Sequence, residues 1–475
     1  MKRNLACLGV VTATGVAIYM VTTLLHPHTT KPMYRYRYTA LLTSHGISPA
    51  TIPNNAKYSE PKYVDFPYED FRISNNVSSV SEDLQAINQP KNRDVLDPYN
   101  PQLKKILFWN SVFGDKSFYF GFGREPFLRA GCRVNTCMTT ADRSMFPHQE
   151  IDAIVWHFRS QDKSLPKQRS PHTRYVFWLL ESPCLMFGSA EPFNQVFNWT
   201  FTYKLDSDFP RPYGSVYRRR KPELASGRNY AAGKTKMAAW LVSNCHALSG
   251  REELVQTLRK WLAIDQYGKC GRLRCKSRDV QQCYAQLAKR YKFYFSFENS
   301  LCRDYVTEKL FNVLRLDMVP VVYGLANYSQ HAPPHSYIDA LSFPTAKALA
   351  DYLIYLDHND TAYNEYFRWK RYYSVRIDWL SKAKPYCDLC ERLHTDSTTK
   401  VYNLEQWFVE DSQCLTREDP LINAFINGVL RLHLTIKLLS WGRILLHSFY
   451  EGVQLLDTFV DQESGCVDGF RVATA

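Results

Sequence analysis

Residues 292–309 read Lys292-Phe-Tyr-Phe-Ser-Phe-Glu-Asn-Ser300, then Leu-Cys, then Arg303-Asp-Tyr-Val-Thr-Glu-Lys309. The apolar first half predicts a buried strand, and the second half predicts a helix that begins near Thr307. Ligands of open α/β sheets bind at the carboxyl ends of strands, and helix N-termini favour phosphate groups. Glu308 and Lys309 in the first turn suit a ribose and a phosphate, so this stretch predicts a nucleotide site. An ordinary capped helix is the alternative.

Short apolar runs on both sides of this stretch predict further strands that alternate with helices. Strands alternating with helices imply parallel sheets, and two such series predict two Rossmann-like domains with a boundary near residue 230. The fold class is therefore α/β. Strands are expected over 106–109, 151–156, 174–179, 197–203, 237–242, 291–297 and 319–323, and helices over 251–262, 307–316 and 346–356.

The N-terminus predicts a membrane anchor. Lys2 and Arg3 precede an uncharged apolar stretch over 5–25, which is about long enough to cross a bilayer. Because the positive charges come first, residues 1–4 are expected in the cytosol and the rest of the chain in the lumen. A cleaved signal peptide is the alternative, although its apolar core is usually shorter.

A luminal location agrees with three other features of the chain. Residues 26–102 are rich in Pro, Ser, Asn and Tyr and predict a stem. All but Cys7 of the 13 cysteines follow the span, which suits disulfides in an oxidising compartment. Four sequons predict N-glycosylation at Asn76, Asn198, Asn327 and Asn359.

Charge and the C-terminal region add further expectations. The net charge of +13 comes without a zinc-finger or RNA-binding pattern, so nucleic acid is not an expected partner. Residues 421–460 combine helical spacing with polar positions, which predicts a packing helix or an interfacial helix rather than a second span. Cys387 and Cys390 have the spacing of half a zinc site, but in the lumen a local disulfide between them is the simpler expectation.

The run from Phe293 to Lys309, together with Val319-Pro-Val-Val-Tyr-Gly324, resembles the signature of the α1,3-fucosyltransferases, glycosyltransferase family 10. The resemblance covers roughly residues 104–408. Two features depart from the family pattern: a long tail beyond Phe408, and Lys204, where many members carry Arg. The other matching blocks are Ile106–Asn110, Phe197–Asp208 with Pro212–Gly214, Lys234–Asn244, Tyr267–Gly271, Pro333–Ile338 and Asn403–Phe408.

The resemblance implies a fold of the GT-B type, with two Rossmann-like domains over 103–230 and 231–408 facing each other across a cleft. A C-terminal helical tail over 409–475 follows. It also implies a Golgi type II membrane enzyme that transfers fucose from GDP-fucose, with inversion, to GlcNAc in a glycoprotein or glycolipid glycan. No cofactor is required on this view, and a divalent cation at most stimulates.

Matching positions imply the residues of the donor site. Glu308 would contact the ribose and Lys309 the diphosphate, and Arg251 aligns more loosely with an arginine that the family uses on the diphosphate. The remaining wall of the site would be formed by Glu298, Asn299 and Tyr305.

Glu181 is the candidate general base. An inverting transfer needs a carboxylate to take the proton of the acceptor hydroxyl, and positive charge to stabilise the leaving diphosphate. Glu181 follows the strand over 174–179 and opens a Glu-Ser-Pro in which the family places its base; without the resemblance it is a solvated loop residue. Asp206 and Asp208 resemble a metal-binding pair of another glycosyltransferase class, but they fall in a block of a metal-independent family, so no metal site is predicted.

Several alternatives stay open. The acceptor is either the innermost GlcNAc of an N-glycan core or a GlcNAc of an outer lactosamine or LacdiNAc unit. His157 lies where related enzymes vary with acceptor preference, and a packed or hydrogen-bonded histidine is equally expected there. A silent luminal glycan-binding protein and a transferase of another nucleotide sugar are competing functions. The joint presence of Glu181, Arg251, Glu308 and Lys309 argues against the first, and the long signature argues against the second.

Overall fold

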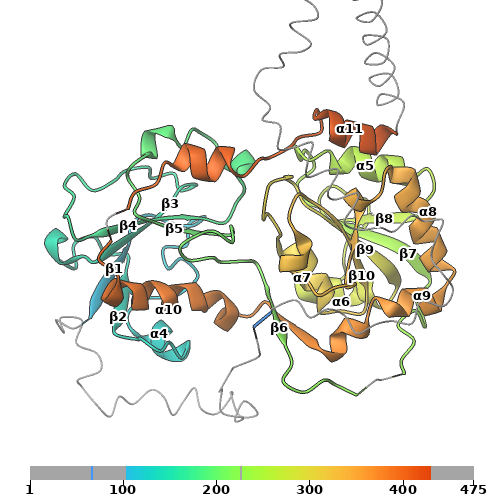
Figure 1. The fold of residues 1–475 in the computed structure, drawn as a ribbon, viewed down its shortest axis with the longest axis horizontal. Coiled ribbons are helices and arrows are strands. Elements are labelled where there is room, and N and C mark those ends of the chain that lie inside the picture. The colour runs from blue at the N-terminus through green and yellow to red at the C-terminus, as the bar shows by residue number, and fades with distance from the viewer. Residues whose placement is uncertain (1–65, 68–102, 225–226, 399, 429–475) are drawn as a thin grey trace, which may run out of the picture. The chain divides into compact units, whose positions relative to one another are not determined.

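The computed structural model describes residues 66–67, 103–224, 227–398 and 400–428. Two five-stranded parallel sheets, each packed against helices, organise these residues (Figure 1). The predicted anchor over 5–25, nearly all of the stem and Asn76 lie outside them. In the described part of the chain, no helix combines the length and the apolar character that a membrane crossing requires. The α/β class with parallel sheets is confirmed.

The first sheet has the strand order β2-β1-β3-β4-β5. All residues of β3 and β4 are buried, because both faces of a central parallel strand are covered. The strand predicted over 174–179 is observed at those bounds, whereas β2 was not predicted. The elements are β1 Lys104–Phe108, α4 Glu125–Arg129, β2 Cys137–Thr140, η3 His148–Glu150, β3 Ala153–His157, β4 Arg174–Leu179, η4 Pro183–Leu185, η5 Glu191–Phe193 and β5 Trp199–Thr202.

The second sheet has the order β11-β10-β9-β7-β8. The strands predicted over 291–297 and 319–323 are observed at those bounds, and the predicted helix over 251–262 ends earlier, at Leu258. Its strands are β7 Lys236–Leu241, β8 Ile264–Tyr267, β9 Tyr291–Phe297, β10 Val319–Tyr323 and β11 Ile338–Asp339. Its helices are α5 Arg251–Leu258, α6 Val280–Ala288, α7 Glu308–Leu314, η6 Tyr328–Gln330, η7 Ala340–Ser342, α8 Ala346–Asp357, α9 Asp360–Glu365 and η8 Arg368–Arg371.

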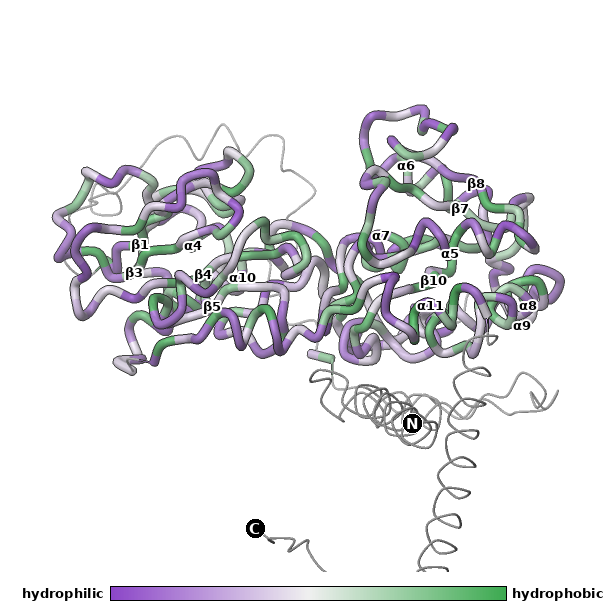
Figure 2. The backbone as a smooth tube through the Cα atoms, turned by 90° about the horizontal axis from the view of Figure 1, so that it is seen from above, coloured by the Kyte–Doolittle hydropathy of each residue, from purple (hydrophilic) through white to green (hydrophobic). Residues whose placement is uncertain are grey.

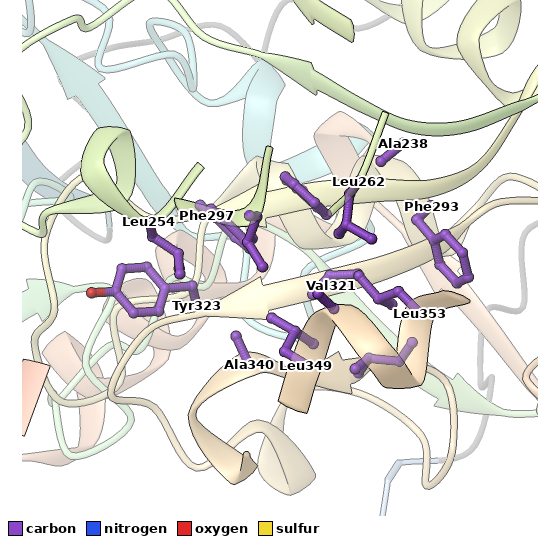
Figure 3. Close-up of a cluster of buried hydrophobic side chains, with 14 of the residues drawn as sticks. Ala238, Leu254, Leu262, Phe293, Phe297, Val321, Tyr323, Ala340, Leu349 and Leu353 are labelled. Atoms are coloured by element: carbon purple, nitrogen blue, oxygen red, sulfur yellow. The ribbon is translucent and has the colours of Figure 1, made fainter. Parts of the chain in front are cut away.

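Apolar side chains between the second sheet and its helices form the largest core cluster. Phe293 and Val321 project from β9 and β10 toward Leu349 and Leu353 of α8 (Figure 3). Each such side chain contributes about 1.5–3 kcal/mol when fully buried. Hydrophobic colour marks much of the strand region of both sheets in Figure 2, and hydrophilic colour dominates the peripheral loops. These contacts fix the helices to the sheet. The sheet in turn fixes the positions of the loops at the ends of its strands.

A C-terminal helix returns to the first sheet. This helix, α10 (Trp379–Thr395), places Tyr386 and Leu389 in one cluster with Phe108, Phe118 and other side chains of the first sheet. Disulfides Cys132–Cys387 and Cys137–Cys390 fasten it there. The segment after it, with the π-helix η9 (Glu405–Glu410), also packs in a cluster of the first sheet through Phe408. The N-terminal lobe thus includes a segment that the domain prediction placed with residues 231–408.

The predicted local disulfide between Cys387 and Cys390 is wrong. The two residues are three positions apart on α10, so their side chains lie on the same face of the helix. That face meets the segment around β2, where each cysteine finds a different partner. Because both cysteines are joined to other cysteines in disulfides, they cannot form half of a zinc site. Three further disulfides join Cys245–Cys270, Cys275–Cys283 and Cys302–Cys414.

Two smaller elements complete the described chain. An antiparallel ribbon pairs β6 (Ser215–Arg218) with β12 (Tyr373–Arg376). Helix α11 (Pro420–Asn427) buries Ile422, Phe425 and Ile426 in the core of the second sheet. The packing-helix prediction for the tail is therefore confirmed for α11, and residues 429–460 lie outside the described residues.

Candidate functional site

The first group of site residues lies where β9 leads into α7. Glu298 follows the last residue of β9 and is 1% exposed. Its carboxylate accepts hydrogen bonds from the Thr307 backbone N–H at 2.8 Å and from the Lys309 Nζ at 3.0 Å. Lys309 Nζ also donates to Thr307 Oγ1 at 2.7 Å and to Glu308 Oε1 at 3.3 Å. Glu298 therefore holds the Lys309 ammonium at the start of α7 rather than presenting its own oxygens to a ligand.

The charges of Lys309, Glu298 and Glu308 depend on one another, because the lysine contacts both glutamates. Burial would lower the pKa of Lys309, but the charges of Glu298 and Glu308 outweigh burial and raise it above its usual range. Burial would raise the pKa of Glu308, yet Lys309 and nearby hydrogen bonds leave that pKa lowered. The Glu308 side chain is half exposed. The segment thus holds a charged ammonium beside an ionised carboxylate at the start of α7.

Arg251 lies at the first position of α5, and its side chain is 3% exposed. Its Nη1 donates to the Phe297 carbonyl at 3.0 Å, and its Nη2 donates to the Asn244 carbonyl at 2.7 Å. The guanidinium therefore ties the loop after β7 to the end of β9, and its charge acts electrostatically on Lys309. The structure brings Arg251 into the predicted site, with its donors on backbone carbonyls.

Buried polar atoms without partners surround the same strand ends. Within the described ranges, Asn299 Oδ1, Tyr328 Oη and His331 Nε2 have no hydrogen-bond partner. Gly324, which follows β10, has no room for a side chain, because a Cβ there would overlap the Tyr328 hydroxyl. Buried polar groups are normally paired, so these three atoms are available to a polar ligand.

Glu181 lies beyond the carboxyl end of β4 in the first sheet. Its Oε2 accepts a hydrogen bond from the Tyr305 hydroxyl at 3.2 Å, and its Oε1 lies 3.8 Å from Arg159 Nη1. The side chain keeps 24% of its surface exposed. Glu181 is thus an oriented carboxylate with an open side, which is the geometry that a general base needs.

Tyr305 belongs to the loop that carries the donor residues, but its hydroxyl faces the candidate base. It is 2% exposed and packs edge-on against Tyr203 at 5.0 Å between ring centroids. Burial raises the pKa of Tyr305 well above its ordinary value, so the hydroxyl stays protonated and donates. Two further contacts join the loop between β9 and α7 to the lobe that contains the first sheet, here called the first lobe. They are the Ser182–Ser300 hydrogen bond of 2.7 Å and the Arg303–Asp206 ion pair. Tyr305, which was predicted as a donor-site residue, therefore also links the donor residues around Lys309 to Glu181.

Two exposed aromatic rings flank Arg159, the arginine that lies near Glu181. The Arg159 guanidinium lies 5.0 Å from the ring of Phe113 and 4.7 Å from the ring of Phe187. These rings are 61% and 76% exposed, and both residues take positive φ angles of 50° and 53°. Left-handed backbone is costly for such residues and is typical of functional loops. This rim suits the apolar face of a sugar.

His157 is a packed histidine. It is fully buried, and its Nδ1 hydrogen bonds with the Ser111 carbonyl at 2.9 Å. Burial lowers the pKa of His157 to about 4, so the ring is neutral. Of the two alternatives for this residue, the structure favours the packed and hydrogen-bonded one.

Asp206 and Asp208 do not share a site. Asp208 accepts hydrogen bonds from Thr200, Arg392 and Tyr402, and Asp206 pairs with Arg303. Their carboxylates are held by separate partners, so the pair has no common position for a cation. The residue groups with metal-ligand spacing in the described part of the chain are Cys137–Cys390–His394 and Cys184–Cys302–Cys414, in which disulfides use four of the five cysteines.

The predicted glycosylation of Asn198 is wrong for the folded chain. Its side chain is buried, its Nδ2 donates to the Lys400 carbonyl at 3.0 Å, and its Oδ1 accepts from the Tyr175 N–H at 2.9 Å. A glycan on Nδ2 would break the first of these bonds and could not leave the core. Asn327 is exposed, and Asn359 is a half-buried N-cap of α9 whose Oδ1 bonds the Ala362 N–H. Glycosylation of these two stays a prediction.

Sequence reasoning missed Arg159 and the residues that join the two halves of the site. Arg159 comes shortly after a predicted strand, so its location at the carboxyl edge of the sheet could have been predicted. The Arg303–Asp206 pair spans 97 positions, and no sequence signal marks it.

Comparison with known proteins shows which family this sequence resembles. A model described as "Glycosyltransferase family 10 (fucosyltransferase) C-term" matches residues 231–407, and one described as "Fucosyltransferase, N-terminal" matches 101–214. Alpha-(1,3)-fucosyltransferase C of Drosophila melanogaster is 36% identical over 349 residues, which cover 67% of this chain and 81% of that protein. Glycoprotein 3-alpha-L-fucosyltransferase A of the same organism is 33% identical over 362 residues, covering 74% of this chain and 67% of that protein. A crystal structure of an α1,3-fucosyltransferase with GDP-fucose aligns at a TM-score of 0.42 and 15% identity, covering 64% of this chain and 93% of that chain.

Proposed function

The chain belongs to the α1,3-fucosyltransferases of glycosyltransferase family 10, and from this premise we propose that it transfers fucose from GDP-fucose, with inversion, to GlcNAc in a glycoprotein glycan. One observation supports the assignment of roles most directly. The loop that leads into α7, where Lys309 lies in the first turn, carries Tyr305, whose hydroxyl donates a hydrogen bond to Glu181. A leaving-group cation and a candidate base are thus connected through one short segment.

The proposed mechanism is a single displacement. GDP-fucose binds at the carboxyl ends of β7, β9 and β10, with its diphosphate near Lys309 and its ribose near Glu308. Glu181 removes the proton of the acceptor hydroxyl as its oxygen attacks the anomeric carbon of fucose and the bond to GDP breaks. The Lys309 charge stabilises the diphosphate as it leaves, assisted electrostatically by Arg251. We place the two lobes in a GT-B arrangement with the reaction between them.

The anchor and the location belong to the same proposal. The apolar stretch over 5–25 would hold the enzyme in the Golgi membrane with its catalytic part in the lumen. Five disulfides in the described residues suit an oxidising compartment. The reaction would need no cofactor, because Lys309 supplies the positive charge that a metal ion provides elsewhere.

The experiment that tests the function uses the full chain, solubilised in detergent, with GDP-fucose and EDTA. The acceptors are an N-glycan core, an N-acetyllactosamine and a LacdiNAc. Transfer in EDTA with an α1,3 linkage, established by NMR of the product, is the expected result, and the best acceptor decides between core and antenna. A folded protein that binds GDP but transfers fucose to none of them would instead support the glycan-binding alternative.

Tyr305→Phe is expected to lower kcat while leaving the affinity for GDP unchanged. The substitution keeps the buried ring and removes the hydroxyl that orients Glu181. A hydrogen bond to a charged group contributes about 1.5–3 kcal/mol, which corresponds to a roughly 10- to 100-fold loss. Steady-state kinetics and calorimetric titration with GDP measure the two quantities.

Tyr203→Phe is the matched control for this variant. Tyr203 is equally buried beside Tyr305, and it has no hydrogen bond to Glu181 in the described structure. A weaker affinity for GDP in Tyr305→Phe, with kcat preserved, would mean that Tyr305 serves the donor and not the base.

A further inference from the structure

Arg211 is a buried cation on the segment that follows β5. The backbone N–H groups of Phe209 and Arg211 donate to the carbonyls of Thr200 and Thr202, so the segment runs extended along β5. In an extended chain, residues two positions apart point to the same side. The Phe209 side chain packs in the cluster that α10 shares with the first sheet, so Arg211 faces α10 as well. Arg211 is 6% exposed.

The Arg211 guanidinium has no anionic partner in the part of the chain that the structure describes. It makes no hydrogen bond and no ion pair there, and its Nε is fully buried without an acceptor. The guanidinium lies 5.8 Å from the centre of the Trp178 ring, close to the outer limit of about 6 Å for a cation–π interaction. Buried charges are normally paired, because burial of an unpaired charge costs stability. Arg211 is therefore available to an anion.

Lys382 is a second cation without a partner beside Arg211. It lies one turn before Tyr386 on the same face of α10, and the Tyr386 hydroxyl accepts a hydrogen bond from Trp178 Nε1 at 3.2 Å. The Lys382 side chain is half-buried and has neither a hydrogen bond nor an ion pair with any described residue. Burial and the neighbouring charge of Arg211 lower the pKa of Lys382. Two positive groups thus lie together between α10 and the end of the first sheet.

The carboxylates that act on Lys382 are held by other residues. Asp378 and Glu308 both raise the pKa of Lys382, but neither forms an ion pair with it among the described contacts. Asp378 pairs with Arg376 at 2.6 Å, and Glu308 pairs with Lys309 at 3.3 Å. The charges of Arg211 and Lys382 are therefore not neutralised by the protein itself.

Tyr213 relates these two cations to the reaction site. Its hydroxyl donates to the carbonyl of Leu180, the residue before Glu181, at 2.9 Å. Burial raises the pKa of Tyr213, the charge of Glu181 raises it further, and the charge of Arg211 lowers it. Arg211 is thus close enough to Tyr213 to act on the tyrosine that also contacts the segment of the candidate base. The strongest charges on Lys309 come instead from its neighbours in the second sheet. The two cations therefore lie on the acceptor side and not at the diphosphate.

We propose that Arg211 and Lys382 bind a sulfate ester of the acceptor glycan. The inference rests on the proposed function and extends it to a charged class of acceptor, since the core, lactosamine and LacdiNAc acceptors named above are neutral. One edge of a guanidinium donates through two N–H groups, and an ammonium adds donors from a second direction. The three terminal oxygens of a sulfate ester can accept from both groups at once, whereas a carboxylate offers two oxygens.

The test removes each charge and compares acceptors that differ only in theirs. Arg211→Met and Lys382→Met keep the apolar stems, and neither residue contacts Glu181 or Lys309 in the described structure. Lys384→Met is the matched control, because Lys384 lies on the same helix with 69% of its side chain exposed. The full chain in detergent is assayed with GDP-fucose and an N-acetyllactosamine. The same acceptor is also used with a sulfate ester on the GlcNAc, with one on the outer sugar, and with a carboxylate on the outer sugar.

The wild type should transfer to a sulfated acceptor with a kcat/KM roughly 10- to 100-fold above that for the neutral one, the usual effect of a hydrogen bond to a charged group. Arg211→Met and Lys382→Met should lose this preference, and Lys384→Met should keep it. Transfer to the neutral acceptor should be unchanged in all three variants. The proposal is overturned if the wild type prefers neither sulfated acceptor, if the preference survives in both variants, or if the carboxylate is preferred to sulfate.

Two measurements without turnover keep the result decisive. Arg211→Met should unfold at a temperature no lower than the wild type, because it removes an unpaired buried charge. A clear fall in that temperature would make Arg211 a structural residue packed on Trp178 and would overturn the proposal. Calorimetric titration of the GDP-bound protein with the sulfated acceptors measures binding alone. Sulfate-dependent binding that Arg211→Met abolishes, in a wild type that transfers fucose to no acceptor, would support this site and refute the proposed function.

Discussion

Replacing Glu181 with glutamine should lower kcat by about 10²- to 10⁴-fold, the usual contribution of a general base. The substitution preserves the size of the side chain, and the amide oxygen can still accept the hydrogen bond from Tyr305. What is lost is the ability to take a proton from the acceptor hydroxyl. The affinity for GDP should stay unchanged, because Glu181 belongs to the first lobe and the donor residues to the second. Steady-state kinetics with saturating acceptor and titration with GDP measure both effects.

The control for this prediction is Glu191→Gln. Glu191 is an exposed glutamate of the same lobe at the start of η5, so its loss removes one charge without affecting the base. Wild-type kinetics are expected for it. A Glu181→Gln enzyme that retained most of its kcat would show that another group removes the proton.

Replacing Lys309 with methionine should weaken GDP binding and lower kcat by roughly 10²- to 10³-fold, the effect of removing one preorganised group that stabilises developing charge. Lys309 is the cation at the start of α7, and its raised pKa keeps it charged at any physiological pH. A second effect accompanies the first. The buried carboxylate of Glu298 loses its partner, and breaking such a pair costs about 3–5 kcal/mol of stability. Kinetics, GDP titration and thermal unfolding measure the three effects.

The double variant Glu298→Gln/Lys309→Met separates chemistry from stability. A neutral glutamine can still accept the hydrogen bond from the Thr307 N–H, so most of the lost stability should return. Transfer should remain as low as in Lys309→Met. Recovery of activity together with stability would contradict the assignment, since it would make Lys309 a structural partner of Glu298 only.

The fold was predictable where burial leaves a continuous apolar run. β4, β9 and β10 match their predicted bounds, because every residue of these strands is buried and their sequences are apolar or aromatic except at Arg174, Lys292 and Ser296. β8, with the sequence Ile-Asp-Gln-Tyr, is an edge strand of mostly half-buried residues, so its sequence is mixed and gave no strand signal. The packing of α10 on the first sheet could not be predicted from the sequence either, because it depends on contacts between residues more than 250 positions apart.

The candidate site divides in the same way. Glu181, Glu308 and Lys309 follow buried strands in the sequence, so their place at a carboxyl edge could be argued from the pattern. The hydrogen-bond partner of each of these side chains could not be predicted from the sequence. That the Tyr305 hydroxyl bonds Glu181, and that Asn198 is held in the core, depends on which distant backbone folds against them. Sequence spacing contains no record of those contacts.

The return of α10 to the first sheet has a cost during biosynthesis. Phe108 and Phe118 share their cluster with Tyr386 and Leu389, so part of the N-terminal lobe has no cover until the ribosome has passed residue 390. Contacts of such long sequence separation slow folding, because a large loop must close before they form. The apolar residues of the first sheet that α10 covers therefore stay uncovered while the whole second sheet is translated, and exposed apolar surface of this kind makes a nascent chain prone to aggregation.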